Sequence, residues 1–237
     1  MSGHSKWSTI KHKKAIEDNR RGKVFTKLVK AIIIAAREGG ADLTTNFKLR
    51  LCVDKAKQAN MPKKNIERAI EKGSGESGGE AYDEAVYEGY GQAKVAVIIE
   101  VVTDNKNRTA SELKQVFDRS GGSLGQTGSV SFLFDKRGRI IVEKVGNGDD
   151  QMLELIDFGA LDVVTGDTYI EILIEPNKLF EMKNKLDSLY KILEAELVYL
   201  PKNLIELEDS VKEKVINFLE TLDDMDDVQQ VYCNAGI

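Results

Sequence analysis

The chain has 237 residues, of which 41% are hydrophobic and 31% charged, so it is long enough for one to three globular domains. No apolar run reaches the roughly 20 residues of a membrane-spanning helix, and we expect no signal peptide because no apolar core follows the first lysine. Cys52 and Cys233 lack partners at metal-ligand spacing, which disfavours a disulfide framework and a zinc module and fits a reducing compartment.

The net charge of −5 is distributed unevenly along the chain. Residues 1–72 hold 18 lysines and arginines against seven acidic residues, a net charge of +11, whereas the remaining 165 residues carry a net charge of −16. This division is typical of a polyanion-binding segment joined to an acidic body.

The basic segment is predicted to be helical. Apolar residues from Phe25 to Ala36 recur with helical spacing, and Gly39–Gly40 ends this first helix. Lys23, Lys27, Lys30 and Arg37 form a second stripe on another face of the same helix. Two further helices are predicted at 46–59 and from Pro62 onward. The residues expected to be buried are Phe25, Leu28, Val29, Ile32, Ile33, Ala36, Leu49, Cys52, Val53, Ala56, Ala59, Ile66, Ala69 and Ile70.

A glycine-rich stretch at 73–79 predicts a flexible linker and a domain boundary. After it the pattern predicts a strand at 94–103 and a helix that begins at the capping-box spacing of Thr109 and Glu112. A loop at 121–128 and a strand at 129–134 follow.

From Arg139 onward the pattern is that of a ferredoxin-like βαββαβ unit. Its predicted elements are a strand at 140–143, a helix at 149–158, strands at 161–165 and 169–174, a helix at 177–188 and a strand at 194–200. A last helix at 210–222 and a strand at 228–232 cannot bury a core by themselves.

We therefore predict an α+β fold in which a helical N-terminal domain precedes two ferredoxin-like α+β domains, the last inserted in the middle one. The boundaries are 1–75 for the helical domain, 76–135 plus 204–237 for the middle domain, and 136–203 for the insertion. The alternative is two sequential units with a C-terminal hairpin extension.

Nucleic-acid binding is the leading functional candidate, because each Lys or Arg near a phosphate releases condensed counterions. Trp7 is placed to stack on a base, although pinning the N-terminal arm to the helical core explains it as well. Lys63 and Lys64 lie in the first turn of a helix, where the dipole disfavours cations, so they face solvent or an anion. The candidate contact residues are Lys6, Trp7, Lys11, His12, Lys13, Lys14, Arg20, Arg21, Lys23, Lys27, Lys30, Lys63 and Lys64.

No arrangement typical of an enzyme is evident, and we predict no catalytic residue, metal site, cofactor or small-molecule substrate. The loop at 121–128 would cradle a phosphate only weakly, because it precedes a strand instead of a helix. The acidic run at 223–227 lacks the glycine and glutamate of a calcium loop and is expected to be a solvated turn. The loop at 103–109 is expected to cap a helix, with Lys106 and Arg108 as possible ligand contacts.

These motifs together resemble the YebC family, which includes the mitochondrial translational activator of cytochrome oxidase subunit one. The resemblance rests on Gly-His-Ser-Lys-Trp at 3–7, Asn-Met-Pro-Lys at 60–63, Tyr-Glu-Gly-Tyr-Gly at 87–91 and Gly-Gly-Ser-Leu-Gly at 121–125, with further matches at 10–13, 21–28, 65–70, 103–111, 128–130 and 228–232. The chain departs at Gln92, Ala93 and Lys94, where the family usually has Pro-Gly-Gly, which bears on the shape of that loop.

The resemblance implies a three-domain α+β protein, cytoplasmic in bacteria, that acts as a DNA-binding transcriptional regulator. Other members resemble ribosome-associated factors that help translation past proline-rich stretches, and this alternative better explains the acidic body. About eight phosphate contacts would give a slope of log K against log salt near −7 on duplex DNA. A small-ligand sensor or hydrolase is a third possibility that only fold analogy supports.

Overall fold

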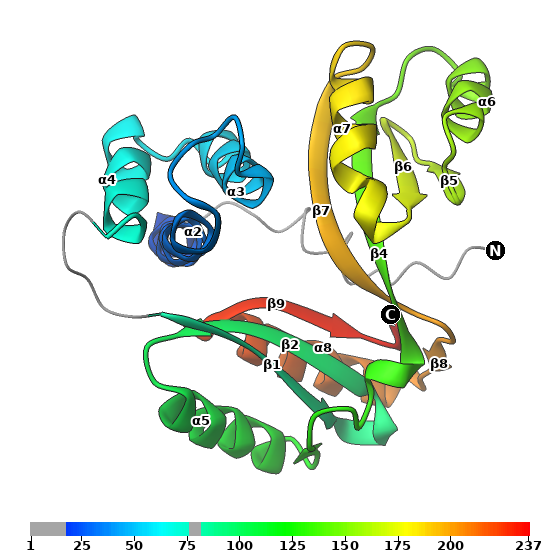
Figure 1. The fold of residues 1–237 in the computed structure, drawn as a ribbon. Helices are drawn as coiled ribbons and strands as arrows, with labels where there is room; N and C mark the ends of the chain where they lie inside the picture. The colour runs from blue at the N-terminus through cyan, green and yellow to red at the C-terminus, as the bar shows by residue number, and fades with distance from the viewer. Residues whose placement is uncertain (1–17, 76–81) are drawn as a thin grey trace. The chain divides into compact units, whose positions relative to one another are not determined.

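The computed structural model describes residues 18–75 and 82–237 (Figure 1). The described chain divides into two compact units, one formed by Asp135–Leu200 and the other by the described residues before and after it. Within the described ranges, no helix combines the length and the hydropathy that crossing a bilayer requires. The six N-terminal candidates from Lys6 to Lys14 lie outside the described residues.

The chain begins its described part with three helices, α2 (Asp18–Gly39), α3 (Phe47–Gln58) and α4 (Lys63–Gly73). The predicted apolar stripe of α2 is confirmed, because Ile32, Ile33 and Ala36 are buried in a cluster that also contains residues of α3 and α4. Asn46 caps α3 through the amide of Leu49 and also donates a hydrogen bond to the carbonyl of Ala35. These contacts join the ends of α2 and α3.

Gly73, predicted to open a linker, is instead the last residue of α4. A Cβ atom added at Gly73 would lie 2.4 Å from the carbonyl oxygen of Ile33, so only glycine allows α4 to approach α2 this closely. The rest of the predicted linker, from residue 76, falls outside the described residues.

The same unit contains an antiparallel sheet with the order β3-β1-β2-β9. Its strands are β1 (Asp83–Tyr90), β2 (Ala96–Thr103), β3 (Ser123–Leu124) and β9 (Val228–Cys233). The helices α5 (Lys106–Arg119) and α8 (Asp209–Asp223) pack on one face of the sheet, where Phe117 and Phe218 meet edge to face with 5.0 Å between ring centroids (Figure 1). Strand β9 brings the end of the chain beside β2.

Two predicted elements of this unit were wrong, and several strands were missed, among them the short β3 inside the predicted loop at 121–128. The predicted strand at 129–134 is a 3₁₀ turn, η2 (Ser131–Leu133), and β1 was not predicted. Helix α5 begins three residues before Thr109, because Asn105 is the N-cap and accepts a hydrogen bond from the amide of Arg108. Thr109 is therefore a buried helical residue and not a cap.

The unit Asp135–Leu200 follows the predicted βαββαβ order, with the strand order β5-β6-β4-β7. Both β4–β6 and β5–β6 pair antiparallel, and Ile140 faces Ile172 across the first pair within the buried face. Its elements are β4 (Phe134–Glu143), α6 (Asp149–Asp157), β5 (Asp162–Thr165), β6 (Tyr169–Ile174), η3 (Pro176–Lys178), α7 (Leu179–Asp187) and β7 (Ile192–Pro201).

Two short strands complete the second unit, because β8 (Ile205–Glu206) pairs parallel with β10 (Ala235–Gly236). The predicted α+β class, with a helical N-terminal region, is thus confirmed. The three predicted domain boundaries stay predictions.

The loop in which the chain departs from the family pattern is strained. Gln92–Lys94 forms the short turn η1 between β1 and β2, and Ala93 and Lys94 have φ angles of 56° and 60°. Residues with a Cβ atom rarely adopt this left-handed region, which glycine enters at little cost. The departure therefore keeps a backbone shape suited to glycine while placing other residues in it.

Replacing Ala93 with glycine is expected to stabilise the protein by roughly 0.5–1 kcal/mol, because it removes the Cβ strain of the left-handed conformation. Ala110→Gly, in the helical interior of α5, is the matched control and should destabilise by about 1 kcal/mol. Urea unfolding at neutral pH measures the stability of both variants. Equal losses of stability in the two would contradict backbone strain at Ala93.

Candidate nucleic-acid interface

The structure describes seven of the thirteen candidate residues, all on α2 and α4. Arg20 and Arg21 lie in the first turns of α2, and their side chains are outside the described part. Lys63 and Lys64 are exposed at the start of α4, where Pro62 is the N-cap. Lys63 forms an exposed ion pair of 3.4 Å with Glu67, a contact that contributes little to stability in water.

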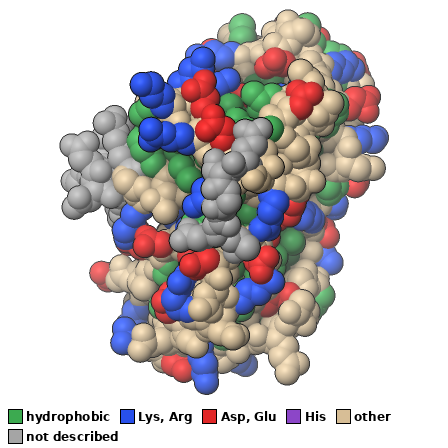
Figure 2. Space-filling model, turned by 60° about the vertical axis from the view of Figure 1, so that its left-hand side comes forward, with side chains coloured by type: hydrophobic (Ala, Val, Ile, Leu, Met, Phe, Trp, Pro, Cys, Tyr) green, Lys and Arg blue, Asp and Glu red, His purple; other side chains and the backbone are tan. Residues whose placement is uncertain are grey.

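Basic and acidic side chains lie interspersed on the face of the molecule in Figure 2. Within the described residues Lys64 forms no ion pair, so its ammonium remains available to an external anion. The basic segment of residues 1–72 thus presents two exposed ammonium groups, those of Lys63 and Lys64, at the start of α4.

The other three candidates occupy one face of α2 and contact the end of α8. Lys23, Lys27 and Lys30 reach the segment Asp223–Asp227, which we call the acidic turn. Lys23 donates to the carbonyl of Asp224 at 3.1 Å, and Lys27 donates to the carbonyl of Asp223. The last carbonyls of a helix have no partner within the helix and attract cations. These lysines therefore act as hydrogen-bond donors to the C-terminal end of α8.

Lys30 is the innermost of the three lysines and is buried. Its Nζ atom lies 2.6 Å from Oδ1 of Asp227 and donates to the carbonyl of Asp226 at 3.0 Å. The side chains of Lys30 and Asp227 are only 10% and 7% exposed. A pair this shielded from water is a structural contact, so Lys30 does not face an external phosphate in this structure.

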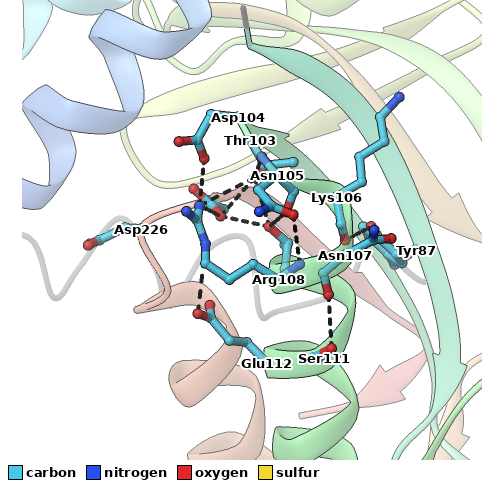
Figure 3. Close-up of polar contacts among 12 residues, drawn as sticks. Tyr87, Thr103, Asp104, Asn105, Lys106, Asn107, Arg108, Ser111, Glu112 and Asp226 are labelled. Carbon is cyan, nitrogen blue, oxygen red and sulfur yellow. Dashed lines mark hydrogen bonds and ion pairs between the residues drawn. The ribbon is translucent and has the colours of Figure 1, made fainter. Parts of the chain in front are cut away.

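A polar cluster around Asp227 joins three parts of the chain, and Figure 3 shows two of its members, Thr103 and Arg108, close to each other. Arg108 donates to Oδ2 of Asp227 at 2.8 Å, and the buried hydroxyls of Thr103 and Thr109 lie 3.0 and 2.7 Å from the same oxygen. The backbone carbonyl of Asp227 accepts a hydrogen bond from the amide of Val102. The carboxylate thereby fixes the end of β2, the start of α5 and the start of β9.

The charge state of this cluster follows from its contacts. Burial by itself raises the pKa of Asp227, but hydrogen bonds from one ammonium, one guanidinium and one hydroxyl lower the pKa far below the ordinary aspartate value. The hydrogen bonds to Asp227 and then to Asp104 raise the pKa of Arg108. Asp227 is therefore ionised at all physiological pH values.

The expectation of a solvated acidic turn is wrong for Asp227, which is buried. The sequence signal that would have found it is its position, since it is the last acid of the run and directly precedes the buried Val228 of β9. The prediction that the loop at 103–109 caps a helix is confirmed by Asn105. Arg108 binds an internal carboxylate in this structure.

The end of the glycine-rich loop at 121–128 and the residues that follow it direct amides at an internal anion. The buried carboxylate of Glu88 accepts hydrogen bonds from the amides of Gly128, Val130 and Ser131 at 2.7–2.8 Å. Burial by itself raises the pKa of Glu88, but the hydrogen bonds from these three amides outweigh burial and hold the pKa below its usual value. Two amides of the loop are thus already paired with Glu88, that of Gly128 with its carboxylate and that of Gly125 with its backbone carbonyl, in agreement with the expected turn.

Within the described residues no group of three or more His, Cys, Asp and Glu side chains is placed to hold a metal ion. Neither cysteine forms a disulfide; Cys233 is buried and Cys52 is half-buried. Burial raises the pKa of Cys52.

The sequence matches one family over most of its length. Residues 5–76 match the family described as TACO1/YebC protein N-terminal domain, and residues 82–235 match TACO1/YebC second and third domain. The chain belongs to the TACO1/YebC family. The resemblance expected from the sequence motifs is confirmed.

Several members of the TACO1/YebC family are similar to this chain over their full length. A protein of Thermoanaerobacter pseudethanolicus is 51% identical over 240 residues, which cover 100% of this chain and 98% of that protein. A Thermotoga maritima protein is 48% identical over 236 residues, covering 99% of this chain and 93% of its own length. Both are named probable transcriptional regulatory proteins.

The fold is also similar to that of a solved structure. The crystal structure of a conserved hypothetical protein from Aquifex aeolicus superimposes with a TM-score of 0.84 and 43% sequence identity. The match covers 92% of this chain and 91% of that chain.

Replacing Asp227 with asparagine is expected to destabilise this TACO1/YebC protein by about 3–5 kcal/mol, because it leaves the buried ammonium of Lys30 without a counter-charge. Asp226→Asn, at the exposed neighbouring position, is the matched control and should change stability by less than about 0.5 kcal/mol. Urea unfolding at pH 7 measures both variants. Similar stabilities of the two variants would show that the Lys30–Asp227 pair is not structural.

The contribution of Asp227 to stability is expected to depend on pH in one direction. Because folding lowers its pKa, its ionisation stabilises the fold fully above the unfolded-state pKa of about 3.9 and loses that effect as the pH falls toward the folded-state pKa. The stability difference between the wild type and Asp227→Asn should therefore be constant between pH 5 and pH 7 and shrink below about pH 4. Unfolding curves at several pH values test this, and a difference that grows on acidification would contradict it.

Proposed function

We propose that this TACO1/YebC protein is a non-enzymatic regulator of gene expression that binds DNA through the basic segment of residues 1–72. The observation that carries the proposal is the net charge of +11 on this segment beside a net charge of −16 on the rest of the chain. Three cations of this segment, Lys23, Lys27 and Lys30, form internal contacts. The remaining excess of cations at one end of an otherwise acidic chain supplies phosphate contacts.

The proposed contacts form two groups. Lys63 and Lys64 extend into solvent from the first turn of α4. The basic residues at 6–14, with Arg20 and Arg21, supply the second group, and Trp7 supplies an aromatic surface for stacking. Phosphate contacts of this kind give affinity without sequence preference, so the target sequence depends on further contacts.

The names of the relatives support a regulatory role. The similar proteins of Thermoanaerobacter pseudethanolicus and Thermotoga maritima are named probable transcriptional regulatory proteins. We propose the same class for this chain and, with it, the absence of an enzymatic reaction.

A salt titration tests the proposal directly. Seven contacts from Lys11, Lys13, Lys14, Arg20, Arg21, Lys63 and Lys64 should give a slope of log K against log salt of about −6 on duplex DNA. The double variant Lys63→Gln/Lys64→Gln should weaken binding and reduce the magnitude of the slope by about 1.8, since each phosphate contact contributes about 0.9. Fluorescence anisotropy of a labelled duplex measures both quantities.

The matched control is Lys114→Gln/Lys214→Gln, which removes two exposed lysines from α5 and α8 in the acidic part of the chain. This variant should leave the slope unchanged. A wild-type slope near zero, or the same loss in both double variants, would reject the proposal.

Competition between duplex DNA and structured ribosomal RNA separates DNA binding from the role of a ribosome-associated translation factor. Both nucleic acids attract a basic segment, so affinity for one of them alone does not decide between the two roles. If the protein binds DNA as proposed, the duplex should displace bound RNA at equal nucleotide concentration. Binding to RNA that duplex DNA does not displace would contradict DNA binding and favour the translation factor.

A further inference from the structure

Three lysines of the basic segment contact another part of the chain, although the outermost, Lys23, also remains half exposed to solvent. Lys23, Lys27 and Lys30 lie four and three residues apart on α2 and therefore form one straight row. The row spans about 10 Å along the helix, the axial rise of about three nucleotides of one DNA strand at 3.4 Å each. Its geometry suits a nucleic-acid backbone, yet in this structure the row contacts the acidic turn.

The acidic turn offers these lysines the kind of acceptors that a phosphate backbone would offer. It carries four carboxylates, and the carbonyls of Asp223, Asp224 and Asp226 accept hydrogen bonds from the row. These carbonyls lie at and just beyond the C-terminal end of α8, which carries the negative end of the helix dipole. The lysine row thus meets a concentrated negative surface supplied by the chain itself.

The contacts weaken from the inner end of the row to its outer end. The shortest distances from Nζ to a carboxylate oxygen are 2.6 Å for Lys30, 3.5 Å for Lys27 and 3.9 Å for Lys23. The exposed fractions of these lysine side chains are 10%, 16% and 46% in the same order. Exposed ion pairs contribute little and are screened by salt, so the outermost pair, Lys23–Asp224, separates far more easily than the buried one. The Lys27–Asp223 pair is intermediate in both distance and exposure.

We propose that the acidic turn is an internal mimic of the phosphate backbone that covers Lys23 and Lys27 until a nucleic acid displaces it. The buried Lys30–Asp227 pair stays in place and holds the turn beside α2. This inference rests on the proposed function, because it assigns a regulation to the same basic segment. It also implies that Lys23 and Lys27 contribute less to binding than their number of charges suggests.

Because the acidic turn must be displaced before Lys23 and Lys27 can bind, only ligands that bind strongly enough to displace it gain these two contacts. A weak or brief encounter with a polyanion does not repay the loss of the internal contacts, whereas an extended backbone offers several phosphates at once to the exposed lysines and to the covered row. The acidic turn therefore disfavours small anions and isolated phosphates relative to long nucleic acids.

The test is the double variant Asp223→Asn/Asp224→Asn, which removes two negative charges and retains the side-chain shape. The matched control is Asp149→Asn/Asp150→Asn, which changes the net charge equally in the first turn of α6. The variant of the turn should bind duplex DNA more tightly than the control, with a salt slope steeper by up to about 1.8, since two more lysines become available at about 0.9 each. Equal affinities and slopes for the two variants would overturn the inference.

A double-mutant cycle identifies the lysines concerned. Lys23→Gln/Lys27→Gln should lower the affinity of the wild type only slightly and that of Asp223→Asn/Asp224→Asn strongly, because these lysines are uncovered in the second background. Equal losses in both backgrounds would show that the row is not covered. Circular dichroism and urea unfolding of each variant establish that the fold is retained.

A measurement on the wild type does not depend on substitutions. Hydrogen exchange of residues 223–226, the part of the turn outside the buried Lys30–Asp227 pair, should become faster when a short duplex is added, because displacement of the turn loosens this segment. Unchanged or slower exchange with bound duplex would overturn the inference. The two proposals fail separately: loss of all duplex binding rejects the proposed function, whereas binding that depends on Lys63 and Lys64 with no response at the acidic turn rejects only this inference.

Discussion

One buried carboxylate, that of Asp227, determines how the first half of the chain is joined to its C-terminal end. Lys30 precedes Asp227 by 197 residues and Arg108 precedes it by 119, yet both charges bind its two oxygens. Removing one partner from such a buried pair leaves an uncompensated charge in a poorly hydrated site, so the pair strongly favours the observed arrangement. The helices of the basic segment and the sheet that follows therefore belong to one compact unit.

Internal anions satisfy two features that would otherwise bind external ones. Asp227 and its acidic neighbours contact the lysine row of α2, and the carboxylate of Glu88 accepts hydrogen bonds from the amides of Gly128, at the end of the glycine-rich loop, and of Val130 and Ser131 just after it. Formal charge counted along the sequence consequently overstates the cationic surface, because part of that charge is already neutralised. The function proposed for this TACO1/YebC protein relies on the cations that stay exposed, above all Lys63 and Lys64 on α4.

Elements with a long or regular apolar pattern could be predicted closely from the sequence. The spacing of Ile32, Ile33 and Ala36 located α2, and the alternation of strands and helices after Arg139 gave the βαββαβ unit. Strand β1 was missed because Glu84, Glu88 and Gly89 interrupt its apolar pattern. Glu88 is buried there only because amides from a loop about forty residues later satisfy its carboxylate, a long-range contact that no local pattern contains.

The sequence by itself determined the α+β class, the positions of most helices and the family, because these follow from local periodicity and contiguous motifs. The tertiary structure alone decided which charges are free. Lys23, Lys30 and Lys64 have equal charges in the sequence, but their surroundings range from a buried carboxylate to open solvent. The reason is physical: the fate of a charge depends on the dielectric and the partners around it, and both are set by segments distant along the chain.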